Sequence, residues 1–120
     1  MALVLIVEDE IFIRQAAEWT MEDLGHTTLI ACDFAQAIAH ISATEKIDAL
    51  FVDMRLSALP FGGLAVASQA ITLQPHLRVL YTSGTPLRAD IADRFVPGGQ
   101  FLLKPYSTEQ LGASLEQLLS

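Results

Sequence analysis

The sequence is poor in residues on which several classes of protein depend. Its one cysteine, Cys32, excludes an internal disulfide and a cysteine-rich zinc site, and it fits a reducing compartment. Only 7 residues are basic against 14 acidic ones, which gives a formal net charge of -7. Because no broad cationic surface can form to neutralise a phosphate backbone, we expect no direct binding of nucleic acid.

Long hydrophobic runs are also missing. The longest run, from Ala2 to Val7, is far too short to cross a bilayer, and no basic segment precedes it as in a secretory signal. We therefore expect a cytoplasmic chain with no membrane insertion.

Apolar residues are nevertheless abundant. The 120 residues are 52% hydrophobic and 18% charged, a composition that argues against disorder and for a well-filled core. This length suits one domain, so we expect residues 1–120 to form a single domain.

Apolar runs and helical spacings alternate along the chain. The first run is continuously aliphatic, which is typical of a strand buried on both faces of a parallel sheet. The predicted strands are Ala2–Val7, Thr27–Ala31, Ile47–Val52, Leu77–Thr82 and Phe101–Leu103. Capping signals mark later helix starts at Asp33 with Gln36, Thr85 with Pro86, and Ser107 with Gln110. We expect the first helix to end at Gly25 and the fourth to be short, ending near Phe95.

This alternation predicts an α/β fold: a doubly wound, five-stranded parallel sheet with five helices. The strand order consistent with it is 2-1-3-4-5, in which the direction of winding reverses between strands 1 and 3. Ligands bind such sheets beyond the carboxyl ends of the strands, at this switch point. Polar residues that follow the strands should therefore lie close together.

Charged and hydroxyl side chains stand at these positions. They are Glu8, Asp9, Asp53, Ser83 and Lys104. Three neighbouring carboxylates repel one another, and a hard divalent cation, Mg²⁺ or Mn²⁺, relieves that repulsion. Since Mg²⁺ commonly binds beside phosphoryl oxygens, the cluster indicates phosphate chemistry.

Lys104, one of two lysines in the chain, stands at the edge of a buried strand and needs a partner. Facing Asp53, it could pair with the carboxylate before reaction and with a transferred phosphoryl group afterwards. Ser83 could donate a hydrogen bond to the same group. A carboxylate can attack phosphorus to give an aspartyl phosphate, so Asp53 is the candidate nucleophile.

At this point the chain resembles the receiver domain of two-component response regulators, which has a flavodoxin-like fold. The matching segments are Val4-Leu-Ile-Val-Glu-Asp-Glu10, Leu50-Phe-Val-Asp53, Val79-Leu-Tyr-Thr-Ser-Gly84 and Phe101-Leu-Leu-Lys-Pro-Tyr106. The resemblance implies that Asp53 receives a phosphoryl group from a phosphohistidine of a sensor histidine kinase or a phosphotransfer protein. It also implies a cis peptide bond between Lys104 and Pro105, since the corresponding bond is often cis in similar proteins.

The resemblance assigns the remaining roles residue by residue. The metal ligands would be Glu8, Asp9, Asp53 and the backbone carbonyl of Arg55. Lys104 would bind the phosphoryl group, and Ser83 and Phe101 would be the switch residues. The side chains of Arg55 and Thr85 would flank the path of the attacking water and tune hydrolysis. One departure is the loop after Asp53, where Pro60 lies further on than in most receivers and Gly62-Gly63 replaces an Asp-Gly pair.

Simpler explanations stay open for several of these residues. The acidic run Glu8–Glu10 could serve only the dipole of the next helix, and Asp53 could be a turn residue. Thr82 is a rival to Ser83, and Phe101 is first of all a core aromatic.

The function we expect is a phosphoacceptor switch that is not an enzyme beyond assisting its own phosphorylation and dephosphorylation. Phosphorylation would change a surface made by the fourth helix, fifth strand and fifth helix, and with it the affinity for a downstream protein target. As the sequence ends with the fifth helix, its output would be non-covalent, as an adaptor, a relay or a phosphate sink. A homodimer stays open.

Two alternatives belong to other classes. One is a receiver-like interaction module that phosphorylation does not regulate. The other is an aspartyl-phosphate phosphohydrolase of the haloacid dehalogenase kind. That family needs a second Asp two residues after the nucleophile, where this chain has Arg55.

Overall fold

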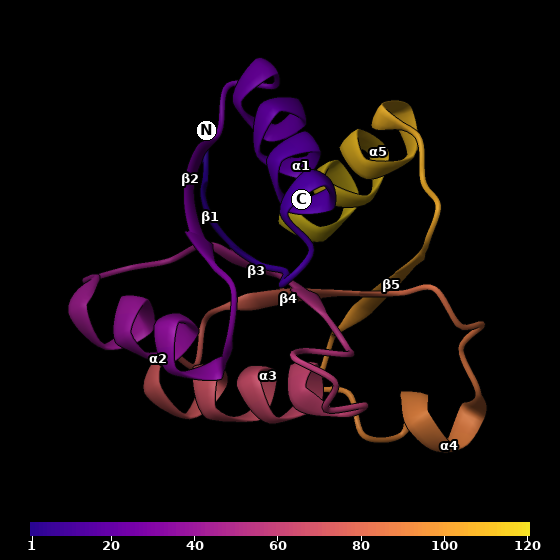
Figure 1. The fold of residues 1–120 in the computed structure, drawn as a ribbon. Helices are drawn as coiled ribbons and strands as arrows, with labels where there is room; N and C mark the ends of the chain where they lie inside the picture. The colour runs from indigo at the N-terminus through magenta and orange to yellow at the C-terminus, as the bar shows by residue number, and fades with distance from the viewer.

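A parallel sheet of five strands forms the centre of the molecule in a computed structural model that describes residues 1–120 (Figure 1). The strands are β1 (Leu3–Val7), β2 (Thr27–Ala31), β3 (Ala49–Asp53), β4 (Arg78–Ser83) and β5 (Gln100–Leu103). They pair in parallel in the order β2-β1-β3-β4-β5. The predicted fold class and strand order are therefore confirmed.

Helices cover both faces of this sheet. On one face lie α1 (Ile11–Asp23) and α5 (Thr108–Leu119), and on the other α2 (Phe34–Ala43) and α3 (Gly62–Leu73) (Figure 1). The short α4 (Ala89–Ala92) lies near the β5 edge of the sheet. None of these helices is both long and apolar enough to cross a membrane.

The core has two apolar layers, one on each face of the sheet. Along β1 the side chains alternate between them: Leu5 and Val7 join the layer beneath α2 and α3, and Val4 and Ile6 join the layer beneath α1 and α5. All four are fully buried, which accounts for the continuous aliphatic run. The polar residues at the end of β1 are thus held on a rigid strand.

The capping signals act largely as predicted. Ser107 and Gln110 form a reciprocal capping box at the start of α5. Asp33 accepts a hydrogen bond from the Gln36 backbone, but the Gln36 side chain accepts one from the N–H of Cys32 instead of Asp33. The start of α2 therefore has the hydrogen bond to the Asp33 side chain but lacks the return bond of a capping box.

The predicted start of the fourth helix, at Thr85, is wrong. The helix α4 begins only after Arg88, whose backbone is extended at φ -100 and ψ 151. The N–H of Thr85 donates to Oγ of Ser83 at 3.0 Å, so Thr85 belongs to a turn that leaves β4 and does not cap a helix. The residues up to Phe95 continue α4 only as turns.

Candidate functional site

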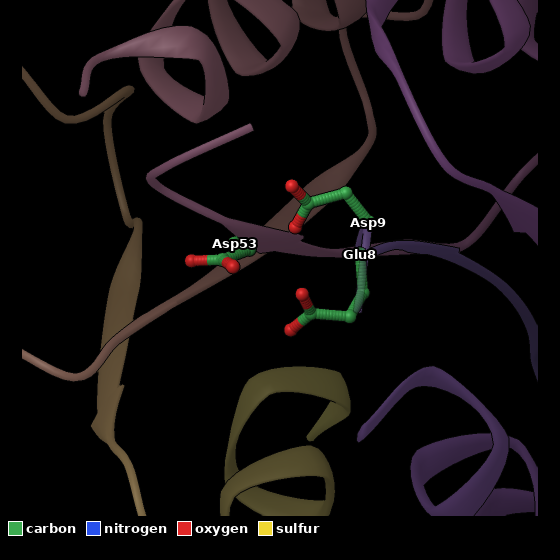
Figure 2. A group of neighbouring side chains, drawn as sticks. All are labelled: Glu8, Asp9 and Asp53. Carbon is green, nitrogen blue, oxygen red and sulfur yellow. The ribbon is translucent and has the colours of Figure 1, made fainter. Parts of the chain in front are cut away.

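Three carboxylates meet at the carboxyl ends of β1 and β3 (Figure 2). One oxygen from each of Glu8, Asp9 and Asp53 lies within 4.8 Å of the others. Glu8 and Asp53 are buried, at 3% and 6% exposure, whereas Asp9 is exposed. These strands flank the switch point of the sheet, where the fold was expected to gather such residues.

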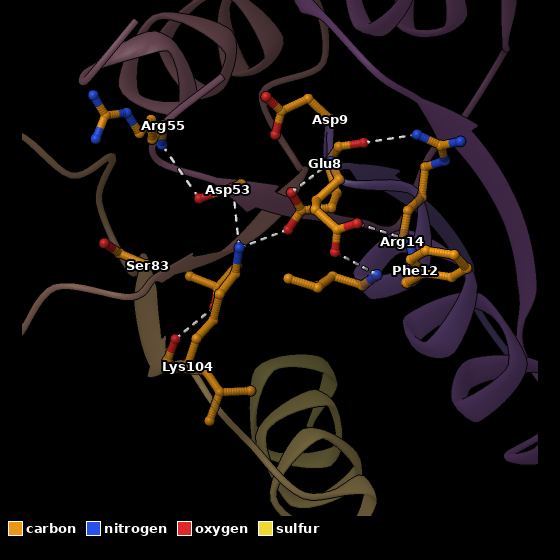
Figure 3. A network of polar contacts seen from close by, with 12 residues as sticks. Glu8, Asp9, Phe12, Arg14, Asp53, Arg55, Ser83 and Lys104 are labelled. Atoms are coloured by element: carbon orange, nitrogen blue, oxygen red, sulfur yellow. Dashed lines mark hydrogen bonds and ion pairs between the residues drawn. The ribbon is translucent and has the colours of Figure 1, made fainter. Parts of the chain in front are cut away.

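Lys104 joins this cluster from the end of β5 (Figure 3). Its Nζ donates to Oε1 of Glu8 at 2.7 Å and to Oδ2 of Asp53 at 3.0 Å. Burial disfavours the charged form of Lys104, but hydrogen bonds to the two carboxylates outweigh it and raise the pKa of this lysine. The pairing with Asp53 was expected from the sequence, and the pairing with Glu8 was not.

Burial has the opposite consequence for Glu8. It raises the pKa of Glu8 to about 7, and the charge of Asp53 acts in the same direction. The hydrogen bond from Lys104 lowers this pKa without cancelling the rise. Burial thus opposes the charged form of Glu8 even beside Lys104.

The cluster fits a hard divalent cation. Its donors are carboxylate oxygens, which are the ligands that Mg²⁺ and Mn²⁺ prefer, and they converge on one point. The ammonium group of Lys104 already contacts two of them, as a positive charge in a carboxylate cluster should. Arg55 lies two residues after the end of β3, and its N–H donates to Oδ1 of Asp53 at 3.2 Å.

Of the acidic run after β1, Glu10 alone serves the following helix. Its carboxylate accepts hydrogen bonds from the N–H groups of Phe12 and Ile13, both at 3.3 Å, and so caps α1. Glu8 and Asp9 point instead towards Asp53 (Figure 2). The run is therefore divided: Glu10 caps the helix, and Glu8 and Asp9 lie with Asp53.

The loop after β3 contacts the side chain of Asp9. The N–H of Ser57 donates to Oδ2 of Asp9 at 2.9 Å. Ser57 and Ala58 have φ of 49 and 66, and the residues on either side of them, Leu56 and Leu59, exchange two backbone hydrogen bonds. This is a tight turn of the type I′ kind, built without the glycine or asparagine that such turns favour.

The two hydroxyls at the end of β4 have different surroundings. Thr82 is 1% exposed, and its hydroxyl donates to the carbonyl of Leu102 at 2.7 Å. Ser83 is only half-buried and lines a pocket together with Asp53. The Thr82 hydroxyl therefore ties β4 to β5, and Ser83 is the residue of the two that lines the pocket of Asp53.

That pocket has a volume of ≈ 550 Å³ and brings most of the predicted site residues together. Among its lining residues are Asp53, Arg55, Ser83, Thr85, Phe101 and Lys104. Glu8 and Asp9 are not among them. The Lys104–Pro105 peptide bond beside it is cis.

Aromatic rings connect β4 to the far side of this pocket. Tyr81 is fully buried and stacks on Phe95 at 3.8 Å between ring centroids. Its hydroxyl accepts a hydrogen bond from the N–H of Val96. Phe95 in turn lies 6.4 Å from the ring of Phe101. Phe101 thus packs on the segment that follows α4 as well as facing the pocket.

Tyr106 is a second aromatic whose surroundings the sequence did not reveal. Its ring meets Phe51 edge-on at 5.8 Å, and its buried hydroxyl has no hydrogen-bond partner. Burial raises the pKa of Tyr106 to about 12, and the charges of Glu8 and Asp53 contribute to the rise. Tyr106 therefore packs beneath the carboxylates as a neutral phenol.

Known proteins match this chain over nearly its whole length. The family model of the response regulator receiver domain matches residues 4–116. The response regulator MprA of Mycobacterium ulcerans is 27% identical over 117 residues, which are 97% of this chain and 49% of that protein. The chain thus spans about half the length of that curated relative.

Solved structures agree. A response regulator receiver protein from Sinorhizobium medicae matches with a TM-score of 0.87 at 28% identity, over 98% of this chain and 94% of that one. The chemotaxis protein CheY4 of Vibrio cholerae shares the fold, with a TM-score of 0.89 at 24% identity over 99% of both chains. Since the family match runs from β1 into α5, the chain belongs to the response regulator receiver domain family of two-component signalling.

Proposed function

We propose that Asp53 accepts a phosphoryl group from a phosphohistidine of a sensor histidine kinase or a phosphotransfer protein. The observation that carries this proposal is the contact of Lys104 Nζ with both Glu8 and Asp53, beside the third carboxylate, Asp9. A buried carboxylate that is paired with a lysine and set among metal-binding groups is suited to become an aspartyl phosphate.

In the transfer step, an oxygen of Asp53 attacks phosphorus and forms the new P–O bond. The P–N bond to the donor imidazole breaks, and the imidazole keeps the electron pair and takes up a proton from solvent. Lys104 neutralises charge on the phosphoryl oxygens, and the Ser83 hydroxyl donates to one of them. Mg²⁺ or Mn²⁺, held by Glu8, Asp9, Asp53 and the Arg55 carbonyl, supplies further charge neutralisation when bound.

The phosphodonor protein needs a surface beside Asp53. A recess of ≈ 590 Å³ opens next to Lys104 and is lined by apolar residues of α1 and of the segment after β5. Phe12, which lines it, is 76% exposed, as expected of a residue that a partner covers. We therefore propose that the donor docks on the start of α1.

The output in this proposal is a change in partner affinity. Movement of Ser83 and Phe101 would alter the surface of α4, β5 and α5 that a downstream protein reads, with residues 1–120 acting as one receiver domain. Such a domain serves as an adaptor, a relay or a phosphate sink. Arg55 and Thr85, which line the pocket beside Asp53, would tune the hydrolysis that resets it.

The test is intact mass after incubation with acetyl phosphate, with and without Mg²⁺. We expect the wild type to gain one phosphoryl group only when Mg²⁺ is present, and Asp53→Asn to gain none. A folded wild type that neither gains the adduct nor binds beryllofluoride would contradict the proposal and favour an interaction module that phosphorylation does not regulate.

A further inference from the structure

The cations of this acidic chain are unevenly engaged. Most are held by the protein itself: Lys46 by Asp48, Arg88 by Asp90, Lys104 by Glu8 and Asp53, and Arg14 and Arg78 by backbone carbonyls. Arg55 and Arg94 are the two whose side chains make no hydrogen bond or ion pair with the rest of the chain. Both are exposed.

These two guanidinium groups belong to one place on the surface. Arg55 lines the ≈ 550 Å³ pocket, and its side chain points away from Asp53 (Figure 3). Cζ of Arg94 lies over the ring of Phe61, 4.9 Å from its centroid, and Phe61 lines the same pocket. The rim of the pocket therefore carries two cations that have no carboxylate partner, on a chain whose net charge is -7.

Part of the pocket wall is apolar, and the pocket is larger than a phosphoryl group needs. The apolar lining includes Pro60, Phe61, Leu87 and Ile91, and the polar lining includes Ser83, Thr85 and Arg88. Its volume lies within the range of roughly 300–1,000 Å³ that is usual for ligand sites. Part of its wall is the loop before α4 (Ala89–Ala92), which contributes Thr85, Pro86, Leu87 and Arg88.

The apolar surface also continues beyond the pocket. Leu59, Phe61 and Leu87 are 60%, 44% and 38% exposed, although each has a large apolar side chain. A small molecule inside the pocket would leave this rim uncovered, whereas an extended segment of another protein would cover it.

We propose that this pocket binds an acidic segment of a partner protein. One apolar side chain of the segment enters between Phe61 and Leu87, and flanking carboxylates bind Arg55 and Arg94. Guanidinium groups suit this role, since each can donate two parallel hydrogen bonds to a carboxylate. The site uses side chains on which phosphoryl transfer to Asp53 does not depend, apart from the shared wall of the pocket.

The probe is the acetylated and amidated peptide Glu-Glu-Phe-Glu-Glu, titrated into isotope-labelled protein and followed by NMR. We expect saturable shifts at the amides of Arg55, Phe61 and Leu87. Two matched peptides separate the contributions: replacing Phe by Ala removes the anchor, and replacing every Glu by Gln removes the charge. Both are expected to bind more weakly.

Variants of the protein locate the site. Arg94→Gln and Arg55→Gln should each raise the Kd of the peptide by about three- to tenfold. Lys46→Gln removes the same charge elsewhere on the surface and should change the Kd less than about twofold. Asp53→Asn removes the phosphoacceptor and a negative charge from the pocket wall, and it should bind at least as tightly as wild type.

Three results would overturn the inference: no saturable shifts, equal binding of all three peptides, or an equal loss in Lys46→Gln and Arg94→Gln. Shifts at the same amides on raising the protein concentration without peptide would assign the pocket to a second copy of the chain instead. None of these results bears on the proposed phosphorylation of Asp53, which is measured separately by mass.

Discussion

Gly63 packs directly against the backbone of Asp53. A Cβ atom at Gly63 would lie 2.3 Å from the carbonyl oxygen of Asp53 and 2.6 Å from Cα of Met54. The N–H of Gly63 donates to the carbonyl of Met54 at 2.8 Å, which ties the first turn of α3 to the end of β3. The absence of a side chain here lets α3 support the residue that we propose as phosphoacceptor.

We expect Gly63→Ala to lower the free energy of unfolding by about 3 kcal/mol, because the contact is with backbone that cannot rotate away. Gly84→Ala is the matched control, since a Cβ there meets nothing within 4 Å. It should change stability by less than about 0.5 kcal/mol. Urea unfolding measures both, and similar values for the two variants would show that α3 shifts without cost.

The raised pKa of Glu8 predicts a dependence of stability on pH. Its pKa is about 7 in the folded chain, against an ordinary value of 4.5, so the folded state binds this proton more tightly than the unfolded state does. The contribution of Glu8 is therefore fully present below about pH 4.5 and is lost as the pH rises through about 7.

Measured against Glu8→Gln, the wild type should lose about 2–3 kcal/mol of unfolding free energy between these two pH values. The measurement is urea unfolding without divalent metal at a series of pH values. Glu116→Gln, which changes an exposed carboxylate, should follow the wild type. A difference between wild type and Glu8→Gln that does not vary with pH would contradict the assignment.

The sheet and the gathering of its polar residues could be predicted because both depend on patterns along the chain. Buried strands require continuous apolar runs, and parallel topology brings their carboxyl ends together. The ion pair between Lys104 and Glu8 could not be predicted, because the direction of a long side chain depends on how distant elements pack around it. The predicted start of α4 was wrong for a related reason: the N–H of Thr85 donates to Ser83 in a turn, and this contact overrides the local helix-capping signal.

The surroundings of Thr82 and Ser83 predict separate effects for the two hydroxyls. Thr82→Val keeps the shape of the side chain but leaves the Leu102 carbonyl without its donor, and it should cost about 1–2 kcal/mol of stability. We expect its phosphorylation by acetyl phosphate to continue. Ser83→Ala should leave stability within about 0.5 kcal/mol and slow phosphorylation. The reverse pattern, in urea unfolding and intact mass, would assign the phosphoryl contact to Thr82.

The turn at Ser57 and Ala58 gives a prediction of opposite sign, a gain in stability. A left-handed conformation costs a residue with a side chain roughly 1–2 kcal/mol, and φ of Ala58 is 66. Glycine avoids this cost but has more freedom in the unfolded chain, so Ala58→Gly should raise the free energy of unfolding by about 0.5–1 kcal/mol. Ala65→Gly, the same change at an exposed position of α3, should lower it by a similar amount. Urea unfolding measures both variants. If both were destabilised alike, Ala58 would not be strained. The turn that places the N–H of Ser57 against Asp9 would then have no conformational cost.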